Sequence, residues 1–386
     1  MTIELDALDL GTIAPVDEDA RQQAEQRQLT LTKPPGALGE LEVLGNQLSA
    51  ISGECPPPVP EPGLVVVFAA DHGVQAQKVS PWPQEITVQM AANIAAGGAG
   101  VNVLARAAGA QVRIVDLGML TPVPGVDDRR IAPGTADFTV GPAMTREQAL
   151  TAIETGRELA RQAADEGYRV LVPGEVGIGN TTPAAALVAV FTGRPAVEVT
   201  GRGAGADDVM LARKAAVIDA GIALNQASAD DPLGALAAVG GFEHAAMVGL
   251  ILGAAELRLP LVLDGVIACS AALVAVALCP AVQGYLVGGH AGAEPAIQAA
   301  HQKLGLRPLV DLGLRLGEGS GGAAALPQVV MAARILHEMA TFADAGVTDS
   351  PEPPTTISGP PTTISEPPTT NPGPPDTTPE PIEASA

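Results

Sequence analysis

The sequence predicts an α/β fold in which a parallel β-sheet is covered by helices on both faces. Apolar runs recur along the chain and end in an acidic residue and a glycine, as in Asp71-His-Gly73 and Asp116-Leu-Gly118. Stretches with helical spacing of apolar residues separate these runs. Strands that are buried on both faces give continuous apolar runs, which is typical of parallel sheets. Aromatic residues make up only 2% of the chain against 47% hydrophobic residues, so small aliphatic side chains must fill the core.

Composition limits the possible partners. The net charge is −22, which argues against nucleic acid or an anionic membrane as a partner. The start of the chain, residues 1–6, is acidic and does not resemble a signal sequence. The three cysteines show no metal or redox spacing, and their odd number suits a reducing cytoplasm. The apolar stretch 266–282 contains Ser270 and Pro280, so we expect a buried helix there and not a membrane span.

Residues 1–62 are predicted to be helical and polar, with one helix over residues 40–51 and a proline-rich end. Lys33 lies in a turn-rich segment before that helix, and we expect it to be a surface charge.

Five runs are predicted to be strands, and each ends close to a carboxylate. Ligands of parallel α/β sheets bind at the carboxyl ends of the strands, so we expect these acids near one edge, although some of them will cap helices. The predicted strands are 64–70, 112–115, 169–172, 261–263 and 308–310, and the acids are Asp71, Asp116, Glu175, Asp264 and Glu318.

The loop 174–183, Gly-Glu-Val-Gly-Ile-Gly-Asn-Thr-Thr-Pro, has the spacing of a phosphate-binding loop. Asn180 occupies the place of the lysine that nucleoside-triphosphate hydrolysis requires, so that activity is not expected. Backbone N–H groups and a helix N-terminus can still bind a monophosphate. We predict that Thr182 caps the helix over 184–191, with Pro183 in its first turn. The first strand is not followed by a dinucleotide-binding fingerprint.

A second glycine loop, 200–208, leads into a predicted helix that carries Arg213 and Lys214. Neighbouring helical residues point about 100° apart, so we expect only one of the two to face a ligand. A solvated basic surface is the alternative.

The third glycine-rich segment, 311–322, places Glu318 between Gly317 and Gly319, before a predicted helix over 323–339. A strand, a glycine bend and a helix start in succession bring backbone N–H groups together around a ligand. Taken alone, this segment fits a solvated glutamate in a loop better; the other loops favour a ligand-facing carboxylate.

Residues 348–386 are rich in proline and threonine, and a Pro-Pro-Thr-Thr-Ile-Ser unit recurs every seven residues. They include six acids and no lysine or arginine. Such a segment cannot build a core, so we predict a disordered tail.

Seven motifs together resemble the nicotinate-nucleotide–dimethylbenzimidazole phosphoribosyltransferase family, in family order over residues 29–347. One departure is Gly292, where the family usually has serine. The motifs lie at 31–39, 70–74, 79–87, 174–182, 201–205, 240–243 and 314–320.

The resemblance implies a Rossmann-like catalytic domain over 63–322 and a small helical domain made of 1–62 and 323–347. It also implies a homodimer with active sites near the subunit interface. No cofactor or metal is implied.

The implied reaction transfers phosphoribose from nicotinate mononucleotide to dimethylbenzimidazole, with Glu318 as the general base. Residues that match family positions are then expected to bind the substrates. These are Ser80, Trp82, Gln84, Glu175, Gly177, Asn180, Thr181, Gly203, Lys214, Leu316 and Gly317.

Alternatives remain for several of these residues. Glu175 could hold the ribose or orient the base, or could instead organise its loop, and Trp82 could simply pack against its own loop. His72 fits a structural hydrogen-bonding role better than that of a base. For the whole protein, the alternatives are the same scaffold acting on another base, such as adenine or a phenol, and a catalytically silent nucleotide-binding protein.

Overall fold

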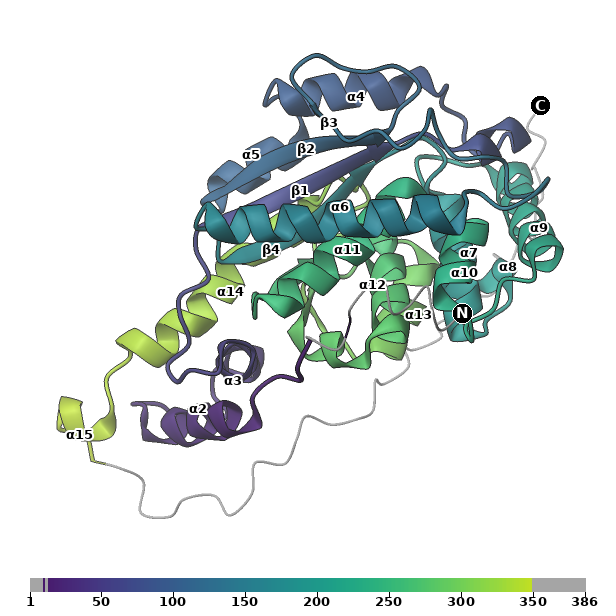
Figure 1. Ribbon diagram of the computed structural model, residues 1–386. Coiled ribbons are helices and arrows are strands. Elements are labelled where there is room, and N and C mark those ends of the chain that lie inside the picture. Colours follow the sequence, from purple (N-terminus) through teal and green to yellow (C-terminus); the bar gives the residue numbers. More distant parts are fainter. Residues whose placement is uncertain (1–9, 11–12, 349–386) are drawn as a thin grey trace, which may run out of the picture. The chain divides into compact units, whose positions relative to one another are not determined.

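The computed structural model describes residue 10 and residues 13–348. Within them, seven strands form one sheet in the order β3-β2-β1-β4-β5-β6-β7, and every neighbouring pair is parallel (Figure 1). The predicted parallel sheet is therefore confirmed. The strands are β1 (Gly63–Ala70), β2 (Ala110–Gly118), β3 (Asp127–Asp128), β4 (Val170–Val176), β5 (Leu261–Leu263), β6 (Leu286–His290) and β7 (Pro308–Val310).

Strand β1 shows why these strands are apolar throughout. Leu64, Val66 and Phe68 pack into one cluster, whereas Val65 and Val67 pack into another on the opposite face. Side chains alternate between the faces of a strand, and both faces are covered, so no position is left for a polar residue. The first cluster also includes residues of α6 (Arg146–Asp165), α7 (Thr181–Thr192), α8 (Ala196–Val199), α9 (Asp208–Asn225), α10 (Pro232–Val239), α11 (Phe242–Glu256), α12 (Val266–Leu278) and α13 (Pro295–Leu304).

The second face is covered by fewer helices, and these come from distant parts of the chain. They are α3 (Glu40–Ser52), α4 (Glu85–Ala95), α5 (Gly100–Ala107) and α14 (Ser320–Glu338). Two further helices, α2 (Glu18–Thr30) and α15 (Phe342–Ala345), lie outside the sheet layers near one end of α14 (Figure 1).

The five predicted strands are present, but the sequence does not reveal β3 or β6. Strand β6 reads Leu-Val-Gly-Gly-His, and two glycines interrupt its apolar run. These glycines have a packing reason: a Cβ at Gly288 would lie 2.8 Å from the carbonyl oxygen of Arg307, and one at Gly289 would collide with the carbonyl oxygen of Leu263 and lie 3.1 Å from Cα of Gly322. Close packing against β5, the start of β7 and α14 therefore explains the glycines that hide this strand in the sequence.

Two local predictions are wrong. Helix α7 begins at Thr181, so Thr182 lies inside it and does not cap it; the N-cap residue is Asn180, whose side chain makes no capping bond. Lys33 is not a surface charge. It is buried, and its Nζ lies 2.8 Å from Oε1 of Glu42, because the turn before α3 folds back over that helix.

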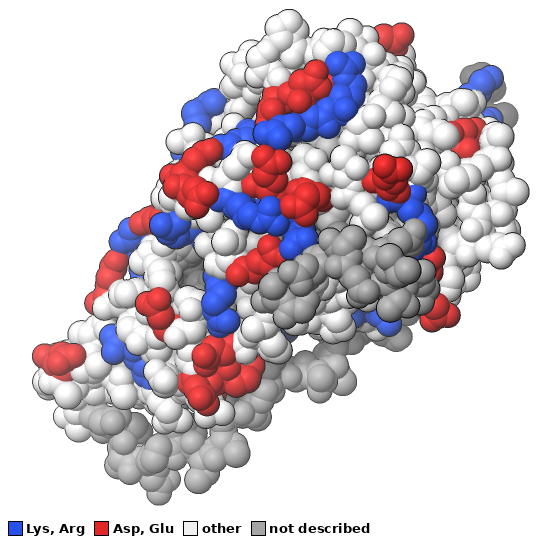
Figure 2. All heavy atoms as spheres, in the orientation of Figure 1, with Lys and Arg blue, Asp and Glu red and all other residues white. Residues whose placement is uncertain are grey.

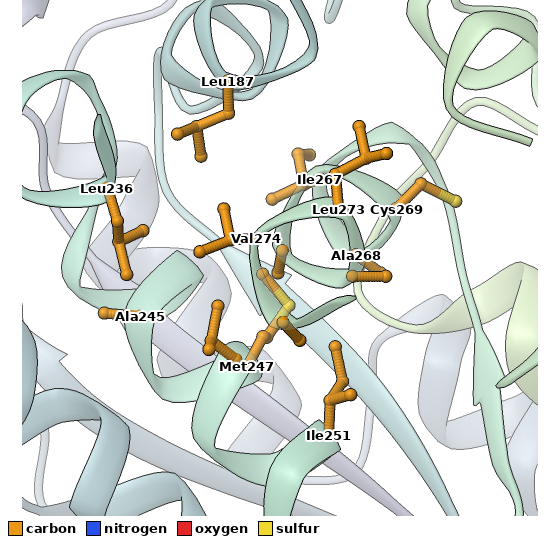
Figure 3. Packing of buried hydrophobic residues seen from close by; sticks show 14 of the residues in the cluster. Leu187, Leu236, Ala245, Met247, Ile251, Ile267, Ala268, Cys269, Leu273 and Val274 are labelled. Carbon is orange, nitrogen blue, oxygen red and sulfur yellow. The ribbon is translucent and has the colours of Figure 1, made fainter. Parts of the chain in front are cut away.

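Helices α7, α10, α11 and α12 build a core of small aliphatic side chains (Figure 3). The buried helix predicted over 266–282 ends at Leu278, and every residue of α12 from Val266 to Ala275 is buried. Helices α6 and α11 can approach each other closely because glycine stands at both contact points. A Cβ at Gly156 would collide with the backbone of Ala246, and one at Gly249 with that of Ile153. Glycine and alanine thus replace the aromatic residues that the composition lacks.

Helix α14 connects the sheet with the N-terminal helices (Figure 1). Its first half packs on the sheet through Ala323 and Leu326, and its last turns meet α2, where Nε of Arg27 donates to the carbonyl oxygen of Leu336 at 2.6 Å. The division into domains 63–322 and 1–62 plus 323–347 stays a prediction. The predicted tail, apart from residue 348, lies outside the described residues.

Charges of both signs are interspersed on the face that Figure 2 shows. Several form ion pairs across α6, such as Arg129 with Glu158 and Arg113 with Glu166. Among the described residues, the stretch Glu85–Ala107 is long and apolar enough by composition alone to cross a membrane. It consists of α4 and α5, separated at Gly97 with φ +80°, and neither helix alone could span the ~30 Å of a bilayer core.

Candidate functional site

A cavity of about 430 Å³ opens at the carboxyl ends of β4, β5 and β6, beside the loop that follows β7. Its volume suits a small ligand. Three segments that the sequence singled out meet in its wall: the Gly174 loop, the Gly201 loop and the Glu318 bend. Of the predicted site residues, Trp82, Glu175, Gly177, Asn180, Thr181, Gly203, Leu316, Gly317 and Glu318 line this cavity.

Glu318 has an unusual backbone. Its φ is +64°, between Gly317 at +85° and Gly319 at +86°. A non-glycine residue in this left-handed region is uncommon and costs free energy, so such residues concentrate at functional sites. The bend also packs so tightly on β4 that a Cβ at Gly174 would lie 2.5 Å from the carbonyl oxygen of Glu318.

Asp264, which follows β5, holds this bend in place. Its carboxylate accepts N–H groups from Gly319 at 3.2 Å, Gly321 at 2.6 Å and Gly322 at 3.1 Å. These donors lie at the start of α14, where backbone N–H groups have no partner within the helix and a negative charge is favourable. The sequence placed Asp264 at the edge of the sheet but gave no sign of this role.

Glu318 is 5% exposed, and its Oε2 accepts the N–H of Val101 at 3.4 Å, at the N-terminus of α5. Burial raises the pKa of Glu318, the negative charge of Asp264 raises it further, and the Val101 N–H partly offsets both effects. A carboxylate whose pKa is raised toward neutrality is a stronger base than an ordinary glutamate.

Glu175 in β4 joins two of the loops. It accepts the side-chain amide of Asn180 and the backbone N–H of Glu318. Burial raises the pKa of Glu175 well above its usual range, and the charge of Asp264 adds to the effect. These contacts fit the loop-organising alternative for Glu175, because they tie the start of α7 to the bend that carries Glu318.

The ammonium group of Lys214 lies beside Thr181 at the N-terminus of α7, and we call this the basic corner of the site. Nζ of Lys214 is buried and donates to Oγ1 of Thr181 at 3.0 Å and to the carbonyl oxygen of Gly201 at 2.9 Å. Burial lowers the pKa of Lys214, and the nearby carboxylate of Glu294 opposes that shift. Arg213 points elsewhere and donates to the carbonyl oxygen of Lys78 at 3.2 Å. Only one of the two cations therefore turns toward the cavity, as expected from helix geometry.

Three predicted site residues do not line the cavity wall themselves. Lys214 reaches it through Thr181. Oγ of Ser80 accepts the N–H of Trp82 at 3.3 Å, and Nε2 of Gln84 donates to the carbonyl oxygen of His72 at 3.3 Å. The Trp82 ring does line the wall and is half exposed, and its Nε1–H donates to the carbonyl oxygen of Ala204 at 2.8 Å.

Sequence reasoning missed other residues in the wall, notably His290, Glu294 and Arg315. Oε1 of Glu294 accepts the N–H of Gly203 at 2.8 Å and thereby shapes the second glycine loop. His290 ends β6, the strand that the sequence pattern hid. Gly292 also lines the cavity, and a Cβ there would lie 3.3 Å from Nε2 of His290.

The remaining acids at the strand ends have structural partners. Oδ2 of Asp71 accepts the N–H of Leu120 at 2.8 Å, and Oδ1 of Asp116 accepts N–H groups of the turn that follows β2. His72 is buried with its Nε2 2.8 Å from Oε1 of Glu243. Those contacts fit the structural role expected for His72. The part of the chain that the structure describes holds no group of three or more potential metal ligands.

A parallel α/β sheet with a buried carboxylate and a basic corner at its ligand-binding edge defines this protein as an α/β enzyme that acts on a small molecule. Comparison with known proteins identifies the family. Residues 13–347 match the family model described as Phosphoribosyltransferase, and the chain belongs to that family.

Its relatives agree with this assignment. The chain is 51% identical over 354 residues to the nicotinate-nucleotide–dimethylbenzimidazole phosphoribosyltransferase of Salinispora tropica, covering 87% of this chain and 97% of that one. A protein of the same name from Roseiflexus is 48% identical over 346 residues, covering 89% and 98%. A crystal structure of the Thermus thermophilus protein of this name superimposes with a TM-score of 0.82 at 44% identity, over 86% of this chain and all of that one. The resemblance seen in the sequence is confirmed.

Proposed function

We propose that this protein transfers the phosphoribosyl group of nicotinate mononucleotide to 5,6-dimethylbenzimidazole. The products are α-ribazole 5′-phosphate, the nucleotide of the cobalamin lower ligand, and nicotinate. The observation that carries the proposal is the carboxyl group of Glu318, which is held in a strained bend at a cavity wall with a raised pKa. The names of the relatives supply the identity of the two substrates.

The chemistry needs one base. The bond between C1′ and the pyridinium nitrogen breaks, and its electron pair stays on that nitrogen, so nicotinate leaves without needing a proton. One benzimidazole nitrogen forms the new bond to C1′ from the opposite face, which converts a β-nucleotide into an α-product. The N–H of the benzimidazole then becomes acidic, and Glu318 accepts its proton. General-base catalysis of this kind contributes ~10²–10⁴-fold in rate.

The cavity wall supplies the other roles that the proposal needs. The N-terminus of α7, with Thr181 and the Lys214 ammonium behind it, holds the 5′-phosphate. The half-exposed Trp82 stacks against the flat bicyclic base, and Glu175 keeps the two loops at their working separation. In the same proposal, Ser80 and Gln84 act through neighbours, because their contacts are to Trp82 and His72.

We also propose that the protein works as a cytoplasmic homodimer. Large apolar side chains beside the cavity are exposed in the single chain, namely Leu316 at 56% and, in the same loop, Leu312 at 62%. Burial of such side chains against a second copy would stabilise a dimer. Light scattering coupled to size-exclusion chromatography would measure twice the monomer mass, and a monomer at micromolar concentration would contradict the proposal.

Product analysis tests the function directly. The purified protein is mixed with nicotinate mononucleotide and, in parallel reactions, with dimethylbenzimidazole, adenine or a phenol. We expect release of nicotinate and formation of α-ribazole 5′-phosphate, with dimethylbenzimidazole giving the highest kcat/KM. A higher kcat/KM with another base would reassign the acceptor. No product with any base, from a protein that still binds the nucleotide, would support the catalytically silent alternative.

A further inference from the structure

Arg315 is the one lysine or arginine among the described residues that line the cavity. The other charged side chains of that wall are Glu175, Glu294 and Glu318. Arg315 is exposed, lies three residues before Glu318, and has no hydrogen bond or ion pair with another described residue. A cation that lines an otherwise acidic cavity, without a partner among the described residues of its own chain, is placed to meet an anion of the ligand.

The proposed donor nucleotide carries two anionic groups, a 5′-phosphate and the carboxylate of the nicotinate ring. The phosphate already has a binding corner, formed by the N-terminus of α7 and Lys214. Arg315 comes from a different element, the loop between β7 and α14. Its planar guanidinium matches a carboxylate with two parallel N–H donors.

We infer that Arg315 binds the carboxylate of the nicotinate ring and so makes the enzyme select nicotinate mononucleotide over nicotinamide mononucleotide. This inference rests on the proposed function. The two nucleotides share ribose, phosphate and pyridinium; they differ only in that one ring carries a carboxylate and the other a neutral amide. A single guanidinium can therefore decide between them.

The same contact strengthens during the reaction. In the bound substrate, the positive pyridinium offsets the carboxylate, so the ring as a whole carries no net charge. As the bond from C1′ to the ring nitrogen breaks, the electron pair moves onto that nitrogen and the departing nicotinate becomes a net anion. An arginine at the carboxylate then stabilises the transition state more than the ground state, which raises kcat as well as lowering KM.

Steady-state kinetics with both nucleotides test the inference. In the wild-type protein, kcat/KM should favour nicotinate mononucleotide. In Arg315→Gln, kcat/KM for that nucleotide should fall by about 10- to 100-fold, the range of a charge-assisted hydrogen bond, while kcat/KM for nicotinamide mononucleotide stays within about twofold. Arg315→Lys, which keeps the charge without the planar fork, should lie between the two. Arg194→Gln, an exposed arginine beyond the opposite end of α7, is the matched control and should match the wild type.

An equal loss with both nucleotides would place Arg315 on the shared phosphate or ribose and overturn the inference. If kcat/KM fell with neither nucleotide, Arg315 would be a solvated surface charge, and the inference would likewise be overturned. A second test does not depend on turnover: calorimetry measures the affinities of the protein for free nicotinate and free nicotinamide. The wild type should bind nicotinate more tightly, and Arg315→Gln should lose that preference; a preference that survives in the variant contradicts the inference even if the proposed reaction fails.

Discussion

At the scale of single residues, Glu318 combines an unfavourable backbone with an unfavourable environment. A left-handed φ in a non-glycine residue costs ~1–2 kcal/mol, and burial of its carboxyl group raises its pKa. The rest of the chain stabilises this state through Asp264, which binds the glycine N–H groups that follow, and through the N–H of Val101. These contacts hold Glu318 in its strained conformation, and mutations can remove them.

Gly317→Ala should displace the neighbouring Glu318 from its working position. Alanine would strain the backbone at φ +85°, and its Cβ would lie 2.5 Å from Oε1 of Glu175. We expect kcat to fall by at least about tenfold, because the bend and Glu175 must move apart. Gly313→Ala is the matched control, since Gly313 has φ +63° but no atom within 4 Å of its would-be Cβ. Equal losses of kcat in the two variants would show that backbone strain alone matters.

Lys214→Met should act on the nucleotide and not on the base. The substitution keeps an apolar stem but removes the ammonium that contacts Thr181 and the Gly201 carbonyl. We expect KM for nicotinate mononucleotide to rise by about tenfold or more, since a charge-assisted contact is worth ~1.5–3 kcal/mol. KM for dimethylbenzimidazole should change little. A nucleotide KM equal to that of the wild type would remove the phosphate role of Lys214.

At the scale of elements, close helix packing replaces large side chains. Helix α11 crosses α6 at glycines, and a Cβ at Gly249 would collide with the backbone of Ile153. Gly249→Ala should therefore lower the free energy of unfolding by about 1–3 kcal/mol through overpacking, measured by urea titration. Gly141→Ala, where nothing lies within 4 Å and φ is not positive, should change it by less than about 1 kcal/mol. A neutral or stabilising Gly249→Ala would contradict this account of the contact.

The buried pair of His72, which follows β1, and Glu243 in α11 should make the free energy of unfolding depend on pH. Burial lowers the pKa of His72, but the charge of Glu243, its hydrogen bond to His72 and the charge of Asp71 together outweigh burial and raise the pKa. Burial raises the pKa of Glu243, but the charges and hydrogen bonds of His72 and His244 outweigh it and hold that pKa far below its usual range. The histidine contribution is fully present below its unfolded pKa of ~6.5 and is lost as pH rises through the raised value. The glutamate contribution is present above its unfolded pKa of ~4.3.

Glu243→Gln should therefore destabilise the protein most between about pH 5 and 6.5, by about 3–5 kcal/mol, the cost of leaving one partner of a buried pair alone. The difference from the wild type should shrink as pH rises through the raised pKa of His72. Urea titrations of both proteins across this range measure the effect. A difference that stays constant from pH 5 to 9 would show that the pair does not carry a titrating charge.

At the scale of the whole molecule, the cavity joins segments that lie more than two hundred residues apart in the chain. Glu318 contacts Val101, 217 residues earlier in the chain, and Asp264 binds the start of α14, 57 residues further on. The parallel sheet brings them together, because all its strands point their carboxyl ends at one edge. The sequence could predict this edge because each apolar run that ends in an acid and a glycine is a local pattern, which can be recognised without knowing the rest of the fold.

Other features could not be predicted because they depend on contacts between distant segments. Strand β6 was missed because its glycines allow close packing against β5, the start of β7 and α14. The burial of Lys33 follows from an ion pair across a turn. Arg315 lies in the wall because of how its loop folds over the sheet, and His290 because it ends β6, the strand that the sequence pattern hid. Local patterns identify a strand or a loop; which side chains then face one another is decided by packing.

The central claim is that the carboxylate of Glu318 removes the proton from the incoming base. Its most direct test is kcat of Glu318→Gln with saturating nicotinate mononucleotide and dimethylbenzimidazole, alongside the free energy of unfolding at neutral pH. We predict that kcat falls by at least about 100-fold. The unfolding free energy should not decrease, because a carboxylate with a raised pKa destabilises the folded state at neutral pH. A stable variant with near-normal kcat would contradict the account.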